Sequence, residues 1–134
     1  MDLSSYESKN ESIKKVLKLM IENVPQIKLL VITSIEGLLI TYFPEQVEDL
    51  PLNPETVAGF VATQNSLAEK LMLVVGRSNL LRVFQELEHN YLITVSVGTR
   101  AVLTAVVRKP VKITLIFFDM KTASEDIDDI INNP

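Results

Sequence analysis

The spacing of apolar residues along the chain restricts the fold more than any other feature of the sequence. Residues 13–24 carry an apolar side chain every three or four positions, which predicts an amphipathic helix that starts after Ser12 and ends before Pro25. Residues 27–34 and 38–43 are short apolar runs separated by a turn, and short runs of this kind predict strands. The first third of the chain therefore predicts a helix followed by a β-hairpin.

A second, longer helix is predicted for residues 54–75. Asn53 is a favourable N-cap, Pro54 suits the first helical position, and Gly76 can close the helix. The segment between the hairpin and this helix is rich in proline and acidic residues, so we expect it to be a loop. The predicted helix is amphipathic, and nine residues form the face expected to pack on a sheet: Val57, Phe60, Val61, Leu67, Ala68, Leu71, Met72, Val74 and Val75.

Three further strands and a last helix complete the predicted order. Residues 80–88, 91–97 and 101–107 are strand-like runs, with turns expected at residues 89–90 and 98–100. Residues 113–131 return to helical spacing. Several strand runs are apolar on both faces, as in strands covered by helices on each side, so the fold class is α/β (α+β) with three layers, α-β-α.

We expect a single domain over residues 11–131, with short tails at residues 1–10 and 132–134. The chain has 134 residues, and no internal repeat or low-complexity segment divides it. No apolar run approaches the roughly 20 residues that a membrane-spanning helix needs, and the first residues lack the apolar segment of a secretory signal. We therefore expect no direct membrane insertion.

The amino-acid composition excludes several kinds of functional site and partner. The chain contains no cysteine, which excludes disulfides, thiolate catalysis and thiolate metal sites and makes a cytoplasmic location the expectation. Its net charge of −4 argues against nucleic acid as a partner, because phosphate binding needs a concentrated basic surface. A cluster of lysines at positions 14, 15 and 18 is read as the solvated face of the first helix.

The sequence offers no convincing catalytic, cofactor or metal site. His89, the single histidine, falls in a predicted turn, where a solvated side chain is expected rather than a catalytic base. The four glycines are scattered, so no phosphate-binding loop or dinucleotide fingerprint is present. The acidic run at residues 125–129 lacks the spacing of a calcium loop. We predict that the chain is not an enzyme and needs no cofactor or metal.

The predicted middle helix carries a second strip beside its sheet-facing side. The strip consists mostly of small residues, which allow another backbone to approach closely: Ala58, Gly59, Ala62, Ser66 and Leu73. We expect it to contact a partner helix; the alternative is that these are exposed residues favoured by helix propensity. Gln64 lies within the apolar side and needs a hydrogen-bond partner there, from sheet backbone, water or its own copy across a two-fold axis.

The strand predicted at residues 80–88 is the second candidate surface, because it follows a helix and pairs in sequence only with the next strand. One face of this strand is charged, and the other can join a second copy through Leu81, Val83 and Leu87. Together with the strip, these residues form the predicted dimer interface. Gly37 and Gly98 are assigned only to structural turns.

The chain resembles the roadblock family, which includes dynein light chains of that name, scaffold subunits of the Ragulator complex and bacterial regulators of polarity GTPases. The resemblance covers about residues 13–131. It rests on the hairpin at residues 31–40, on the long helix after a variable loop, and on residues 82–84 and 91–103. Family members often have Asp before the turn glycine, where this chain has Glu36.

The resemblance implies a profilin-like fold, a five-stranded antiparallel sheet with the middle helix on one face and the terminal helices on the other. It also implies dimers, with itself or with a roadblock paralogue, built by pairing the third strand and packing the middle helices side by side. Members bind or regulate Ras-like small GTPases, or they scaffold complexes without chemistry of their own, so the resemblance makes this chain a candidate GTPase-activating protein. Two alternatives stay open: a purely structural adaptor, and a longin-like or ligand-sensing domain, against which the leading helix argues.

Overall fold

The structure is a computed structural model that describes the backbone of residues 3–133 and the side chains of residues 8–133. Eight elements follow one another in the order that the sequence predicts. They are α1 (Leu3–Asn23), β1 (Ile27–Ser34), β2 (Leu39–Phe43), α2 (Pro54–Val75), β3 (Arg82–Glu86), β4 (Asn90–Val97), β5 (Ala101–Arg108) and α3 (Ile113–Asn132).

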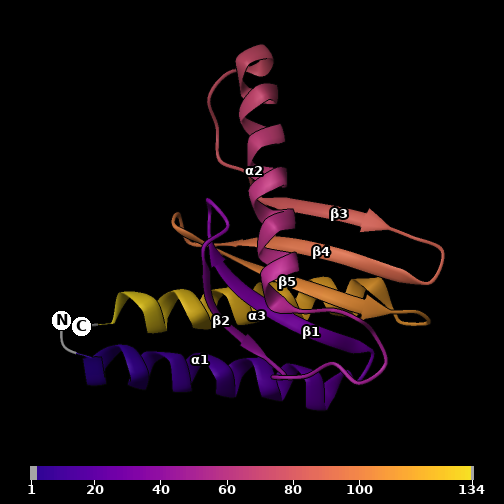
Figure 1. Cartoon of the computed structure of the whole chain (residues 1–134). Helices are drawn as coiled ribbons and strands as arrows, with labels where there is room; N and C mark the ends of the chain where they lie inside the picture. Colours follow the sequence, from indigo (N-terminus) through magenta and orange to yellow (C-terminus); the bar gives the residue numbers. More distant parts are fainter. Residues whose placement is uncertain (1–2, 134) are drawn as a thin grey trace.

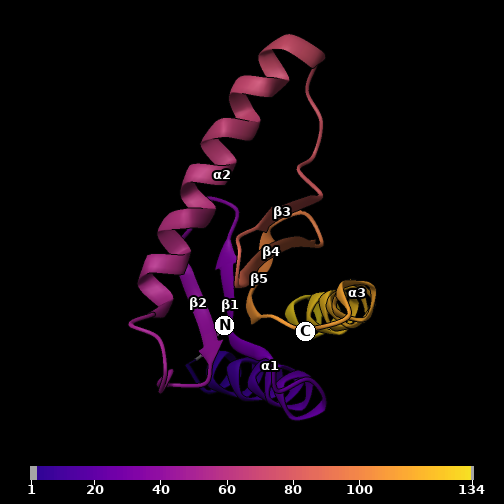
Figure 2. The same ribbon diagram turned by 90° about the vertical axis from the view of Figure 1, so that its right-hand side faces the viewer.

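The five strands form one antiparallel sheet in the order β2-β1-β5-β4-β3, so β2 and β3 are its edges (Figure 1). Helix α2 lies on one face of the sheet, and α1 and α3 lie side by side on the other (Figure 2). This arrangement confirms the predicted three-layer fold. No helix within residues 3–133 has the length and apolar character needed to cross a membrane.

Apolar residues fill the space on both faces of the sheet. The larger core lies between the sheet and the terminal helices and includes Leu17, Leu30, Leu103 and Met120, all fully or almost fully buried. A smaller core under α2 is built on Leu29, Val31 and Val57. Alternate residues of β1 therefore enter opposite cores, which explains why the strand is apolar on both faces.

Both ends of α2 are capped as the sequence indicates. The Oδ1 atom of Asn53 accepts a hydrogen bond from the backbone N–H of Thr56 at 2.8 Å, and Pro54 occupies the first turn. At the other end, Gly76 adopts φ 100° and its N–H donates to the carbonyl of Met72. In Figure 1, α2 crosses the strands and its C-terminal half projects past β3. We call this projecting half, residues 65–75, the arm.

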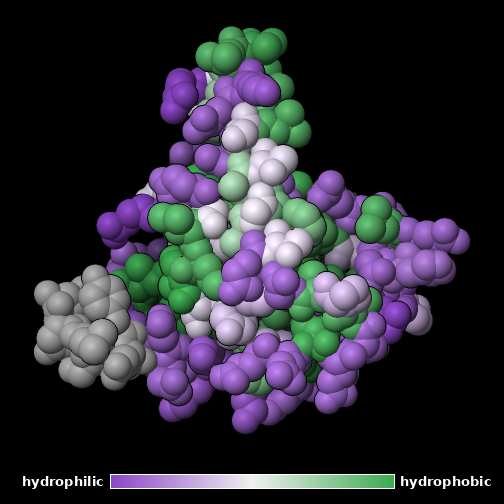
Figure 3. Space-filling view, viewed as in Figure 1, coloured by the Kyte–Doolittle hydropathy of each residue, from purple (hydrophilic) through white to green (hydrophobic). Residues whose placement is uncertain are grey.

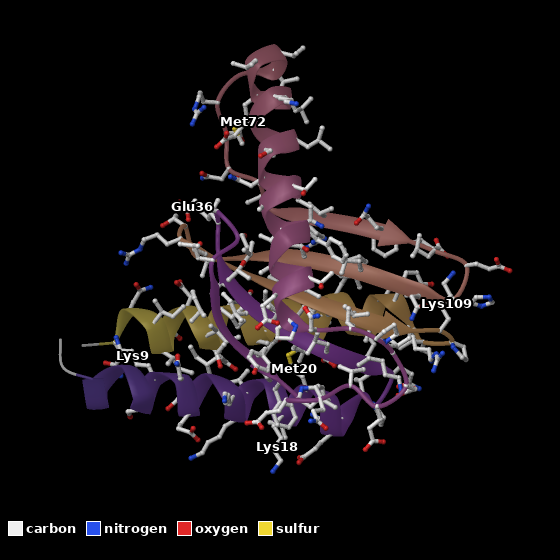
Figure 4. All side chains as sticks on the ribbon, in the orientation of Figure 1. Lys9, Lys18, Met20, Glu36, Met72 and Lys109 are labelled. Atoms are coloured by element: carbon white, nitrogen blue, oxygen red, sulfur yellow. The ribbon has the colours of Figure 1, made fainter. Side chains whose placement is uncertain are left out.

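Two element boundaries differ from expectation. Helix α1 begins at Leu3, so residues 3–10 are helical rather than a tail; Met1, Asp2 and Pro134 lie outside the described residues. Lys9, in this additional part of α1, donates a hydrogen bond from Nζ to the carbonyl of Ile131 at 3.0 Å (Figure 4). The contact joins α1 to α3 and places a positive charge at the C-terminal end of α3, where the helix dipole favours it. Strand β3 is also shorter than the predicted run at residues 80–88.

Candidate interaction surface

The arm exposes a row of large apolar side chains. Leu67 is 69% exposed, Leu71 59% and Val74 82%, and Phe60, one turn before the arm, is 43% exposed. At about 100° per residue these four positions fall on one side of α2. We call Phe60, Leu67, Leu71 and Val74 the seam. The prediction that the four seam residues pack on the sheet is wrong, because α2 extends beyond the edge of the sheet. Val57 and Val61 lie over the strands and are buried as predicted.

Strand β3 leaves its outer edge unpaired, since within residues 3–133 it pairs only with β4. The opposite edge, β2, is less suited to accept another strand. Its ladder with β1 shifts between Ile32 and Thr33, where Ile40 is skipped, and such a bulge twists an edge away from further pairing. The regular, five-residue ladder of β3 makes it the better docking edge.

A groove of about 650 Å³ lies between α2 and strands β3, β4 and β5. Phe60 and Leu67 form its helix wall, Val83 and Leu87 form its strand wall, and residues 50–52 of the preceding loop close one end. Figure 3 shows apolar residues gathered at the tip of the arm and along its side above β3. Phe60 and Leu67 of the seam thus border one apolar groove together with Val83 of β3.

Two amide side chains in this region have no hydrogen-bond partner among the described residues. Both polar atoms of Gln64 and the Nδ2 atom of Asn90 are shielded from solvent and unpaired, and both residues line the groove. A buried amide without a partner costs free energy in a single copy of the chain. The groove is therefore a place where added hydrogen-bond partners would stabilise the structure.

Two residues of the small-residue strip contact the chain's own hairpin. Ala58 is 6% exposed and Ala62 half-buried, because both lie against the β1–β2 turn. A Cβ atom added to Gly37 would meet the Ala58 carbonyl oxygen at 2.7 Å and Ala62 Cβ at 2.8 Å. The close approach that these alanines permit is made by the chain's own hairpin, whose tip carries Glu36 beside α2 (Figure 4). The other three members of the strip, Gly59, Ser66 and Leu73, are exposed.

The remaining residues predicted for the site lie as follows. Leu81 and Leu87 are exposed beside β3, and Val83 is half-buried in the groove wall. Gly37 and Gly98 stand in turns with φ of 92° and 58°. His89 is exposed beside Glu88, with 3.8 Å between Nε2 and Oε1. Among the side chains of residues 8–133, no three His, Asp or Glu groups gather in a way that could hold a metal ion.

The face of β3 that points away from the groove is held by its own chain. The guanidinium of Arg82 lies 5.0 Å from the ring centroid of Phe117, and the ring of Phe84 stacks on Tyr91 at 5.5 Å. Glu86 Oε2 accepts from Lys109 Nζ at 2.6 Å, and this hydrogen bond raises the pKa of Lys109 above its usual value (Figure 4 labels Lys109). Strand β3 is therefore anchored on one face and open on the other.

No protein-family model matches the chain, and no curated protein matches its sequence. Solved structures share its fold. Gliding protein MglB from Thermus thermophilus superposes with a TM-score of 0.82 at 17% identity, covering 94% of this chain and 93% of that chain. MglB with a tetrameric arrangement gives 0.80 at 17% identity, covering 91% and 89%. A Roadblock/LC7 domain from Streptomyces avermitilis gives 0.68 at 16% identity, covering 87% and 94%. The chain has the roadblock fold.

Proposed function

We propose that the chain is a dimeric roadblock-type interaction module that binds a small Ras-like GTPase, as its regulator or as a scaffold for it. One observation supports the part of this proposal that concerns binding to another protein: the unpaired edge of β3 lies beside the seam of exposed apolar side chains on α2. A contiguous apolar surface next to a free strand edge is typical of a protein–protein interface.

The length of α2 supports a second copy, or a roadblock paralogue, as the first partner. Its 22 residues span about 33 Å, whereas five strands set about 4.8 Å apart span only about 19 Å from the first to the last. If the β3 edges of two copies pair, the sheet continues, and the arm of each copy lies over the sheet of the other. Each groove then receives the partner's arm, which covers both sets of apolar residues at once.

The second half of the proposal, GTPase binding, comes from the resemblance to the roadblock family rather than from any single residue. MglB with its tetrameric arrangement is a protein of this fold that assembles with itself. A dimer would leave Gly59, Ser66 and Leu73 near the outer side of the paired helices, where a further protein can approach. We place the GTPase partner on this assembled surface.

The test mixes the purified protein with Ras-like GTPases from the same genome, each loaded with GDP or with a non-hydrolysable GTP analogue. Binding that depends on the nucleotide supports a regulator, and faster hydrolysis of GTP would make the protein an activator. Binding to both states supports a scaffold. A dimer that binds no GTPase but pairs with other roadblock domains would replace the proposal with the structural-adaptor alternative.

A further inference from the structure

The hydrogen bonds between β3 and β4 identify which backbone groups face the free edge. The carbonyl of Leu81 accepts from the N–H of Ser96 at 3.0 Å, and the N–H of Leu87 donates to the carbonyl of Asn90 at 2.8 Å. In an antiparallel pair, successive residues alternate between pointing their N–H and C=O groups toward one neighbour and toward the other. Odd-numbered residues therefore bond to β4. Arg82, Phe84 and Glu86 direct their backbone groups outward.

We propose that a second copy pairs with this edge in an antiparallel register centred on Phe84, so that Arg82 lies opposite the partner's Glu86. This inference rests on the proposed function, because it specifies how the dimer is built. In this register all five residues of β3 take part, and its three outward-facing residues bond to the same three of the partner. Two-fold symmetry creates the Arg–Glu contact twice.

Charge favours this register over its neighbours. Residues directly opposite each other point to the same face of a sheet, so opposite charges attract and like charges repel there. Centring on Val83 would place Arg82 opposite the partner's Phe84. Centring on Gln85 would place Glu86 opposite the partner's Phe84 and would pair Arg82 with the partner's Glu88, which lies beyond the end of β3. Centring on either Arg82 or Glu86 would oppose two identical charges. Only the register centred on Phe84 pairs both charges of the five-residue strand with their opposites.

The side chains that would meet are already held in place. Arg82 rests on Phe117, Phe84 on Tyr91, and Glu86 on Lys109, whose Nζ lies 4.8 Å from the centroid of the Tyr91 ring. Glu86 remains about half exposed, so it can accept a second cation. Positioning before binding reduces the side-chain entropy that an interface costs.

The spacing of the seam residues on α2 fits the same two-fold axis as the strand register. Phe60, Leu67 and Val74 are seven residues apart, so an antiparallel pair of helices centred on Leu67 brings Phe60 against the partner's Val74. Leu67 lines the groove together with Val83 and Gln85, the two neighbours of Phe84. The centre of the helix seam and the centre of the strand register therefore lie in one region, as a single two-fold axis requires.

A charge-reversal experiment tests the register by sedimentation equilibrium. Arg82→Glu places two glutamates opposite each other, and Glu86→Arg does the same with two arginines, so each variant alone should dimerise about tenfold or more weakly. An equimolar mixture of the two single variants should recover a heterodimer, because every opposed pair is then attractive. The double variant R82E/E86R should recover a homodimer.

The possible results separate this inference from the proposed function. A monomeric wild-type protein would overturn self-association and the register together. A dimeric wild-type protein whose single variants dimerise normally, or are weakened without rescue in the mixture and in the double variant, would overturn the register and leave the dimer standing. Circular dichroism of each variant identifies loss of folding.

Single cysteines give a measurement that does not depend on charge, since the chain has no cysteine of its own. Only the residue on the axis lies opposite its own copy, at about 5.5 Å between Cα atoms, a separation that a disulfide can bridge. Phe84→Cys should form a covalent dimer under mild oxidation, whereas V83C and Q85C should react at least about tenfold more slowly. Faster cross-linking through position 83 or 85 would contradict the register.

Discussion

Gly37 in the β1–β2 turn lies directly against Ala62 of α2, so close that an added Cβ atom would stand 2.8 Å from the Cβ of Ala62. Gly37 has a φ of 92°, a backbone conformation that a residue with a side chain adopts only with strain. Gly37→Ala should therefore lower the free energy of unfolding by about 2 kcal/mol or more, measured by chemical denaturation. Gly59→Ala is the matched control: no atom lies within 4 Å of its added Cβ, and a helical alanine should stabilise by about 0.5–1 kcal/mol. Equal effects of the two substitutions would contradict the close packing of the turn.

The hydroxyls of Thr94 and Thr104 form a buried hydrogen bond of 3.1 Å between β4 and β5. Thr94→Val should cost about 1–2 kcal/mol, because Thr104 is left without its partner in a dry interior. The double variant T94V/T104V should cost less than the sum of the two single variants, since it leaves no unpaired hydroxyl. Strictly additive costs in the double-mutant cycle would show that the two hydroxyls do not interact.

The seam should control self-association without supporting the fold of the single chain. Leu67→Glu and Leu71→Glu should each weaken dimerisation by about 2 kcal/mol or more, because a charge would be buried in an apolar contact. Both side chains are exposed in one copy, so the stability of the monomer should change by no more than about 0.5 kcal/mol. Analytical ultracentrifugation measures the first effect and denaturation at low concentration the second.

Leu73→Glu is the matched control for the seam. Leu73 is 84% exposed but lies on a different side of the arm, within the small-residue strip. If this variant dissociates the dimer and the seam variants do not, the interface is the strip that the sequence predicts rather than the seam.

Asp49 anchors the loop before α2, because its Oδ2 atom lies 3.4 Å from Lys28 Nζ and 2.9 Å from Arg108 Nη1. Lys28 and, to a smaller extent, Arg108 hold the pKa of Asp49 below its usual value of 3.8. A folded-state pKa below the unfolded value means that the contribution to stability is present above pH 3.8 and is lost as the pH falls through the folded-state pKa. Asp49→Asn should lower the melting temperature slightly at neutral pH, and its difference from wild type should shrink below pH 3.8. A difference that does not change with pH would contradict the ion-pair anchor.

Much of the fold follows from the sequence, because apolar spacing and capping residues act locally. Asn53, Pro54 and Gly76 mark both ends of α2 correctly. The direction in which a helix crosses a sheet is a tertiary property, and the spacing of Leu67 and Leu71 is the same whether a sheet or a partner covers them. The helix length was a usable signal, since 22 residues are longer than the width of a five-stranded sheet crossed at right angles.

The roles of the small residues could not be predicted for a similar reason. Ala58 and Ala62 indicate that some backbone comes close, but not which one, and the structure places Gly37 there. Leu3 and Tyr6 continue the spacing of the apolar stripe backward, but the six polar residues 7–12 separate them from Ile13 and interrupt the pattern. The contact from Lys9 to Ile131 joins residues 122 positions apart. A contact between residues so distant in sequence cannot be predicted from the local spacing of apolar residues.

The mass of the wild-type protein in solution tests the central claim most directly. Sedimentation equilibrium at micromolar concentration should give twice the 15.0 kDa of one chain, and the Leu67→Glu variant should return to the mass of one chain under the same conditions. A wild-type mass of 15.0 kDa at every concentration tested would contradict the proposal that the arm and the β3 edge bind a second copy.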